Sequence, residues 1–183
     1  MSLATIHTQA LNGVTPIPVT VEVHISNGLP ALAIVGLPEA AVRESKDRVR
    51  AAIINSGFEF PARKITVNLA PADLPKDGGS YDLPIAIGIL AASQQIPDAL
   101  LNQLEFHGEL ALSGELRGVS GALPIAIGAK QQNHTLILPC DSAQHACLIE
   151  GTKVYQASYL LEICQFLHQQ LTLETPQQPQ LTE

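Results

Sequence analysis

The sequence predicts a single α/β (α+β) domain in which helices pack on a mixed β-sheet in two layers. The chain has 183 residues, enough for one core of ordinary size. Apolar residues make up 46% of it and aromatic residues only 4%. The core is therefore aliphatic, as expected where β-branched strands lie under Ala- and Leu-rich helices. Segments with strand and helix periodicity follow one another along the whole chain.

Charge and cysteine content exclude several classes of protein. The net charge of −7 argues against a basic nucleic-acid clamp. The three cysteines are odd in number and form no CxxC pair, which favours a reducing, cytoplasmic compartment. The N-terminus has no signal-peptide pattern, and the longest apolar runs fall short of the about 18 residues of a membrane span. We expect a cytoplasmic protein with no membrane partner.

Three strands are expected first. Residues 3–9 and 17–25 alternate apolar and polar side chains, the period of a half-exposed strand, and Asn12-Gly13 marks a tight turn between them. Residues 30–35, PALAIV, are continuously apolar, as in a strand covered on both faces. The tight turns predict an antiparallel start to the sheet.

A helix is expected to open at residues 36–39 and to close at Gly57, a residue typical of helix C-termini. Its apolar stripe predicts the buried face, made of Val42, Val49, Ala52 and Ile53. Residues 65–69 then predict a strand.

Asp82 is expected to cap the next helix, with Pro84 in its first turn. The later elements alternate in type: a strand at 104–112 with a hairpin return at 115–117, a helix at 122–131, a strand at 135–138, a short helix after Asp141, a strand at 152–156 and a helix at 159–169. The hexapeptide LPIAIG occurs at 83–88 and again at 123–128, which predicts two neighbouring, similarly docked helices.

The stretch least like a packed element is 70–88, APADLPKDGGSYDLPIAIG, in which a polar, Gly-rich loop joins a strand to a helix. With the preceding residues from Gly36, it resembles the N-terminal domain of the ComM/YifB, magnesium-chelatase-like family, and the likeness runs from Met1 to about Leu171. The resemblance implies the Lon-protease-like fold, also called ribosomal protein S5 domain 2-like.

The resemblance also implies a longer protein. Residues 1–171 correspond to the family's N-terminal domain, and the Pro- and Gln-rich residues 172–183 to a linker leading to an AAA+ ATPase module. No GxxxxGK[ST] phosphate loop occurs in the chain, so ATP and Mg²⁺ are expected in that module and no cofactor in this domain.

The family implies a bacterial, hexameric, ATP-dependent helicase that promotes DNA branch migration during natural transformation. The first hypothesis is a non-catalytic accessory domain, whose partners are its own AAA+ module, neighbouring subunits and possible DNA. Two alternatives remain: a Lon-like serine peptidase domain, and a magnesium-chelatase-type ATPase subunit domain.

Ser80 is the candidate nucleophile of the peptidase alternative, because residues 76–80 resemble the Lon motif PKDGPSAG. A serine needs a nearby base. Pro124 occupies the position of the Lon lysine, and Lys130 lies about two helical turns further on. Lys76 remains as the other candidate base. The favoured interpretation of Ser80 is an ordinary polar residue of the loop or of the helix start, and no catalytic residue is assigned.

The same loop is a candidate anion or ligand site. Gly78, Gly79 and Ser80 precede a helix N-terminus, whose free N–H groups favour anions, and Lys76 adds a positive charge. The flanking Asp77 and Asp82 oppose it. A fixed backbone turn is the alternative role of the glycines.

Basic residues crowd the helix that precedes this loop. Arg43, Lys46 and Arg50 are candidate contacts to DNA phosphates. Acidic residues interleave with them, so a solvated helix face is the alternative. Histidines and cysteines are scattered without metal-ligand spacing, and no metal site is expected.

Overall fold

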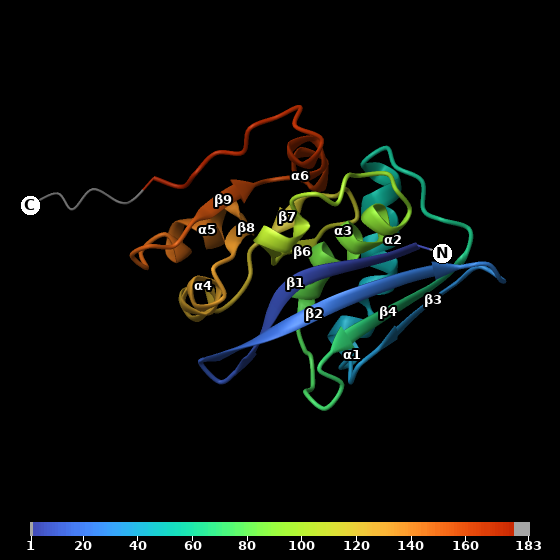
Figure 1. Cartoon of the computed structure of the whole chain (residues 1–183), viewed down its shortest axis with the longest axis horizontal. Coiled ribbons are helices and arrows are strands. Elements are labelled where there is room, and N and C mark those ends of the chain that lie inside the picture. The colour runs from blue at the N-terminus through green and yellow to red at the C-terminus, as the bar shows by residue number, and fades with distance from the viewer. Residues whose placement is uncertain (1, 178–183) are drawn as a thin grey trace, which may run out of the picture.

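The computed structural model describes residues 2–177, and it confirms a mixed sheet with helices packed on it (Figure 1). The seven-stranded sheet has the order β3-β4-β2-β1-β5-β8-β9, and β6 and β7 form a separate hairpin. The strands are β1 (Ser2–Asn12), β2 (Thr15–Ser26), β3 (Ala31–Val35), β4 (Lys64–Ala70), β5 (Leu104–Phe106), β6 (Glu109–Leu110), β7 (Leu116–Arg117), β8 (Thr135–Pro139) and β9 (Val154–Ala157).

Helices cover one face of the sheet along most of its width and the other face at one end. Side chains from β8 show the division, because Ile137 belongs to the larger apolar cluster and Leu136 and Leu138 to the smaller one. The larger cluster includes α1 (Ala40–Arg43), α2 (Ser45–Asn55), α3 (Asp82–Ala92) and α6 (Leu160–Leu167), and the smaller one α4 (Ala122–Gln131) and α5 (Cys140–Ala146). No helix in residues 2–177 is long and apolar enough to cross a membrane.

The helix α3 is the centre of the larger cluster. All of its residues are buried except Ala91, which is half-buried. It packs on the β1–β2 hairpin, whose inner row alternates with exposed or half-exposed residues and includes Val19, Val21, Val23 and Ile25. The period-two pattern of β2 therefore faces this helix, as the sequence indicates.

The prediction for β3 is wrong in its pairing. β3 lies parallel to β4 and does not pair with β2, and it is the edge strand of the sheet. Its side chains Ala31, Ala33 and Val35 are exposed. The continuous apolar run therefore reflects an edge strand and not one covered on both faces.

Two other expected elements are broken. The helix expected from residue 36 to 57 is divided at Glu44 into α1 and α2. The strand expected at 104–112 ends at Phe106 and resumes as β6, which leaves the main sheet and pairs with β7.

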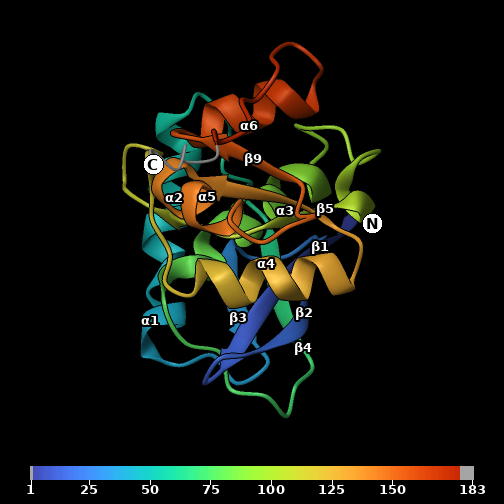
Figure 2. The same ribbon diagram turned by 90° about the vertical axis from the view of Figure 1, so that its left-hand side faces the viewer.

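The two LPIAIG helices lie on opposite faces of the β1–β2 hairpin and not side by side (Figure 2). A Cβ at Gly88 would lie 2.5 Å from Val23 Cγ2, whereas one at Gly128 would lie 2.1 Å from Gln9 Oε1. Val23 pairs with Ala4, and Gln9 is an odd number of residues away from Ala4 on the same strand, so the two contacts are on opposite faces. The shared glycine allows close approach in both places.

The C-terminal segment returns to the sheet. Leu173 is buried, and the Gln156 N–H donates to the Glu174 carbonyl at 2.8 Å, so Glu174 bridges β9. The domain boundary at 171 stays a prediction, and residues 178–183 of the expected linker lie outside the described residues.

Lys76 is fully buried and joins three segments. Its Nζ donates to the carbonyls of Gly36 and Leu69, each at 2.8 Å, and to that of Pro71. The backbone of Lys76 is hydrogen-bonded as well: its N–H donates to the Leu37 carbonyl, and its carbonyl accepts from the Glu39 N–H. One ammonium group thus holds together the ends of β3 and β4 and the loop after β4.

We expect Lys76→Met to lower the free energy of unfolding by about 2–4 kcal/mol, because the carbonyls of Gly36, Leu69 and Pro71 lose the charged donor that they share. Urea unfolding followed by circular dichroism measures this. Lys153→Met, at an exposed position, is the matched control and should stay within about 0.5 kcal/mol of the parent. Equal unfolding midpoints for the two variants would contradict the role of Lys76.

Candidate functional site

A cavity of about 370 Å³ opens where the loop before α3 faces the loop before α4. The residues that line it come from β1, β6, these two loops and the first turns of the helix at 122–131, and they include Gln9, Asp77, Gly78, Gly79, Ser80, Glu109 and Ser120. The tertiary structure therefore brings the Gly-rich loop together with residues 118–120, about forty positions later.

The loop turns at Gly78, whose φ of 89° favours glycine. A short 3₁₀ turn, Gly79–Tyr81, then leads into α3. A Cβ at Gly79 would lie 2.9 Å from Glu109 Oε2, so the absence of a side chain lets this carboxylate lie against the loop. The charged side chains that line the cavity are Asp77 and Glu109, and the cavity is therefore negative.

Ser80 lines the cavity and is half-buried, but no lysine reaches it. Lys76 Nζ is bonded to three carbonyls, and Lys130 Nζ donates to the Glu150 carbonyl at 2.8 Å. Within residues 2–177, no hydrogen bond joins the Ser80 Oγ to a lysine. Both lysines that the sequence offers as a base are held elsewhere.

The predicted anion loop is assembled in part. Gly78, Gly79 and Ser80 line the cavity, whereas Lys76 does not. An anion there would face two carboxylates. Anion binding stays a prediction, and the geometry gives Lys76 a structural contact.

Asp82 is not the helix cap that the sequence predicts, because α3 begins at Asp82 and no side chain caps it. Its buried carboxylate accepts from Arg48 Nε at 2.7 Å and from Arg48 Nη2 at 3.1 Å. It also accepts from the Leu110 N–H at 3.0 Å. The bidentate pair joins α2, α3 and β6 along the wall that carries Glu109.

A buried polar cluster lies behind Gln9. Gln9 Nε2 donates to Glu105 Oε2 at 2.7 Å and to the Ile125 carbonyl at 2.9 Å. His107 Nε2 and His134 Nδ1 each lie 3.6 Å from a Glu105 oxygen, and the His7 ring stacks on His134 at 4.5 Å. This cluster fixes the side chain of Gln9 and the start of α4, both of which form the cavity.

The cluster shifts two pKa values. Burial raises the pKa of Glu105, but the imidazoles of His107 and His134, each 3.6 Å from the carboxylate, and the hydrogen bond from Gln9 outweigh it and bring the pKa down to about 2. Burial, together with the charge of His134, lowers the pKa of His7. Both groups disfavour proton uptake by the folded protein.

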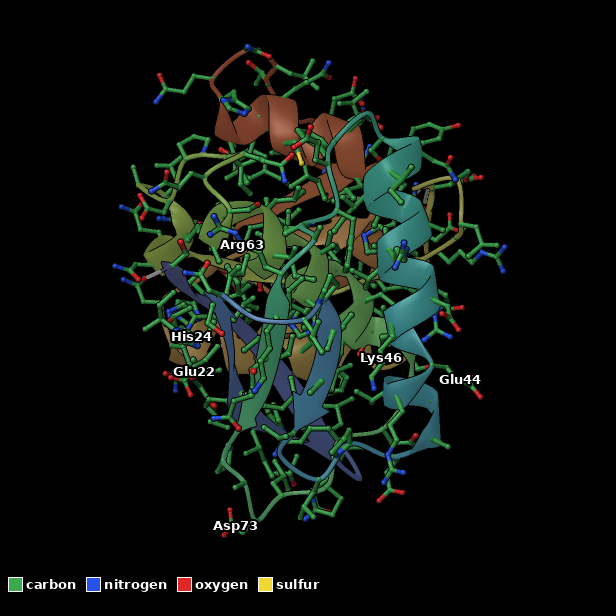
Figure 3. The ribbon with its side chains drawn as sticks, turned by 90° about the vertical axis from the view of Figure 1, so that its right-hand side faces the viewer. Glu22, His24, Glu44, Lys46, Arg63 and Asp73 are labelled. Atoms are coloured by element: carbon green, nitrogen blue, oxygen red, sulfur yellow. The ribbon has the colours of Figure 1, made fainter. Side chains whose placement is uncertain are left out.

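The three predicted DNA contacts lie on the α1–α2 segment. Arg43, the last residue of α1, and Arg50 are exposed, and Lys46 is half-buried. Lys46 and Arg50 are four residues apart on α2 and share a helix face. The Arg43 Nε donates to the Pro38 carbonyl at 3.1 Å, and the Arg50 guanidinium lies 5.4 Å from the Phe60 ring. Figure 3 shows Lys46 and Glu44 directed away from each other.

Sequence reasoning missed Glu109 and Gln9, which line the cavity, and Glu105, which holds the side chain of Gln9. The signal for Glu105 was a carboxylate inside the apolar stretch LEFHGEL, two residues before a histidine. In the described part of the chain, no group of three His, Cys, Asp or Glu side chains is placed to hold a metal ion.

The chain is similar to a known family model and to several known proteins. Residues 21–142 match the family model "Subunit ChlI of Mg-chelatase". The chain is 54% identical over 176 residues to YifB of Salmonella typhimurium and 52% identical over 170 residues to the competence protein ComM of Haemophilus influenzae, covering 96% and 93% of this chain. It is 26% identical over 160 residues to the Lon protease of Chlamydia muridarum, covering 80% of this chain and 19% of that protein. It spans about a third of the length of YifB and ComM, 35% and 33%.

We expect acid to destabilise this domain through Glu105. The folded pKa of about 2 lies below the ordinary 4.5, so the stabilisation is complete above pH 4.5 and is lost as the pH falls toward 2. Glu105→Gln should therefore show a flatter pH dependence of the unfolding free energy in this window, measured by urea titration. Glu39→Gln, at an exposed carboxylate, is the control. Parallel curves for the parent and Glu105→Gln would contradict the assignment.

Proposed function

The chain belongs to the ChlI magnesium-chelatase-like family, with YifB and ComM among its relatives, and on that premise we propose that it is a non-catalytic accessory domain of an ATP-driven DNA-processing machine. The machine is an AAA+ helicase that acts in branch migration during natural transformation. In it the domain positions the ATPase subunits or their DNA, and ATP and Mg²⁺ bind elsewhere in the protein.

One observation carries this proposal: the cavity keeps Ser80 but has no lysine beside it. Lys76, the lysine of the loop itself, has its ammonium group in contact with three backbone carbonyls. A serine hydroxyl without a base is a weak nucleophile. The same contacts make the loop rigid, which suits a domain that holds other parts in place.

A peptidase is the second candidate, favoured by Ser80 in the cavity wall and by the similarity to a Lon protease. The two candidates differ in one chemical property. A peptidase requires a reactive Ser80 Oγ, which a fluorophosphonate probe labels, whereas an accessory domain does not.

In the full-length protein, we expect deletion of residues 1–171 to reduce branch migration or oligomer formation by at least about tenfold, an ordinary coupling between parts of a machine. Ser80→Ala should leave both unchanged, and the probe should not label Ser80. ATPase, branch-migration and sedimentation assays measure these effects. Unchanged activity and oligomer size after the deletion refute the accessory role, and labelling of Ser80 with turnover of unfolded casein establishes the peptidase.

The proposal includes a weak contact between the α1–α2 segment and DNA phosphates. Arg43 and Arg50 are exposed on it, and Arg48 is not available because it is paired with Asp82. Contacts of this kind carry no sequence preference and weaken with salt.

For this contact, we expect Arg43→Ala, Lys46→Ala and Arg50→Ala together to weaken DNA binding and to lower the salt slope by about one per residue. Fluorescence anisotropy at several salt concentrations measures both. The control is the triple variant Arg117→Ala, Lys130→Ala and Lys153→Ala, which removes the same number of positive charges from the C-terminal half. Equal losses in the two variants, or no binding by the parent at low salt, remove DNA from the proposal.

A further inference from the structure

The strand β1 extends beyond the strand that pairs with it on one side. β2 pairs antiparallel with the full length of β1. On the other side, the parallel strand β5 pairs with β1 at a single position, His7 opposite Glu105. In the described part of the chain, no strand lies beside residues 9–12 on that side. This end of β1 is therefore an internal edge of the sheet, and residues 9–11 line the cavity.

The Gly-rich loop explains why β5 stops there. Alternate residues of a strand direct their backbone groups to the same side. The His107 N–H donates to the Ile137 carbonyl in β8 at 3.3 Å, so we expect the groups of the next residue, Gly108, on the side of β1. The Gly108 N–H donates instead to the Ser80 carbonyl at 3.1 Å, and the Gly108 carbonyl accepts from the Leu83 N–H at 3.0 Å. Both groups that would continue the pairing with β1 are therefore bonded to the segment that enters α3.

The backbone groups left open on β1 alternate in kind. In the bridge between His7 and Glu105, the neighbours of Glu105 face β1, so His7 exchanges the hydrogen bonds with them. Gln9 and Leu11, two and four residues later, direct their backbone groups to the same side. Within residues 2–177, the Gln9 carbonyl and both backbone groups of Leu11 have no partner there. An acceptor, a donor and an acceptor at strand spacing form the pattern that a further strand complements.

The cavity beside this edge suits a narrow, positively charged chain. Its other walls consist largely of glycine and serine residues from the loops before α3 and α4. Asp77 and Glu109 are the charged side chains that line it, and neither forms an ion pair within the described residues. Arg48, which lies along the wall of Glu109, is paired with Asp82. The negative charge of the cavity is therefore open to a cation from outside.

We propose that the cavity binds an extended, basic peptide segment of a partner protein, which adds to β1 as a strand and is held without being cleaved. Its backbone pairs with Gln9 and Leu11, and a lysine or arginine side chain is neutralised by Asp77 and Glu109. A volume of about 370 Å³ accommodates a short segment and not a folded domain. DNA does not suit this cavity, because its phosphates would face two carboxylates.

Such a site gives the domain a binding activity of its own, which goes beyond the accessory role and does not depend on it. The deletion experiment in the full-length protein tests the accessory role, whereas peptide binding is measured on the 183-residue chain.

Fluorescence anisotropy with three labelled heptapeptides tests the proposal. The first peptide is Gly-Thr-Val-Arg-Val-Thr-Gly, and the second has glutamate in place of the arginine. The third is N-methylated at its three central residues, which removes the N–H donors on both edges of the strand but keeps the charge. The first should bind, and the other two should bind at least about tenfold more weakly, because one loses the charge and the other the backbone pairing.

Variants of the protein test the charged wall. Asp77→Asn combined with Glu109→Gln should weaken binding of the arginine peptide by about tenfold and make the remaining binding less sensitive to salt. Glu59→Gln combined with Asp98→Asn removes the same charge from exposed positions outside the cavity. This matched control should bind like the parent. Thermal unfolding verifies that both double variants remain folded.

Amide hydrogen exchange provides the readout for the backbone. The Leu11 amide should gain protection when the arginine peptide is added, whereas the Ala10 amide, which faces β2, should be protected throughout. No binding of the arginine peptide up to about 1 mM, equal binding of the three peptides, equal effects of the two double variants, or unchanged exchange at Leu11 would each overturn the proposal. Mass spectrometry should recover the peptide intact, and its cleavage would overturn the proposal as well, because the cavity would then be a peptidase site.

Discussion

The burial of one ammonium group is the constraint on which the site depends. Lys76 contacts carbonyls from the end of β3, the end of β4 and the loop that follows. A buried cation must be surrounded by acceptors, and these three satisfy it. The position of the loop follows, since the backbone of Lys76 also pairs with the segment that enters α1. The same burial removes Lys76 from chemistry in the cavity.

A second buried charge completes the frame around the cavity. Asp82 at the start of α3 is held by Arg48 from α2 and by the backbone of β6. The contacts of Lys76 fix the Gly-rich loop before its turn, and those of Asp82 fix it after the turn. A loop held in this way is suited to presenting a fixed surface, which agrees with a domain that positions other parts of a machine.

Most of the secondary structure could be predicted from local sequence patterns. The alternation in β1 and β2 and the apolar stripe of the α1–α2 segment are properties of neighbouring residues, so the sequence predicted them. Contacts between segments that are far apart in the sequence were harder to predict. Nothing in ALAIV distinguishes an edge strand from a central one, and Lys76 looks like a surface residue until carbonyls from Gly36 and Leu69 surround it. Glu105 likewise depends on His107 and His134, which meet it only in the folded chain.

The two glycines of the repeated hexapeptide have a mechanical consequence. Gly88 on one side and Gly128 on the other press their helices directly onto the β1–β2 hairpin. A close-packed interior has low compressibility, and here the helix backbones lie directly against the side chains of Val23 and Gln9. The β1–β2 hairpin is therefore tightly packed on both of its faces. We therefore expect the two helices and the hairpin to move together as one rigid unit.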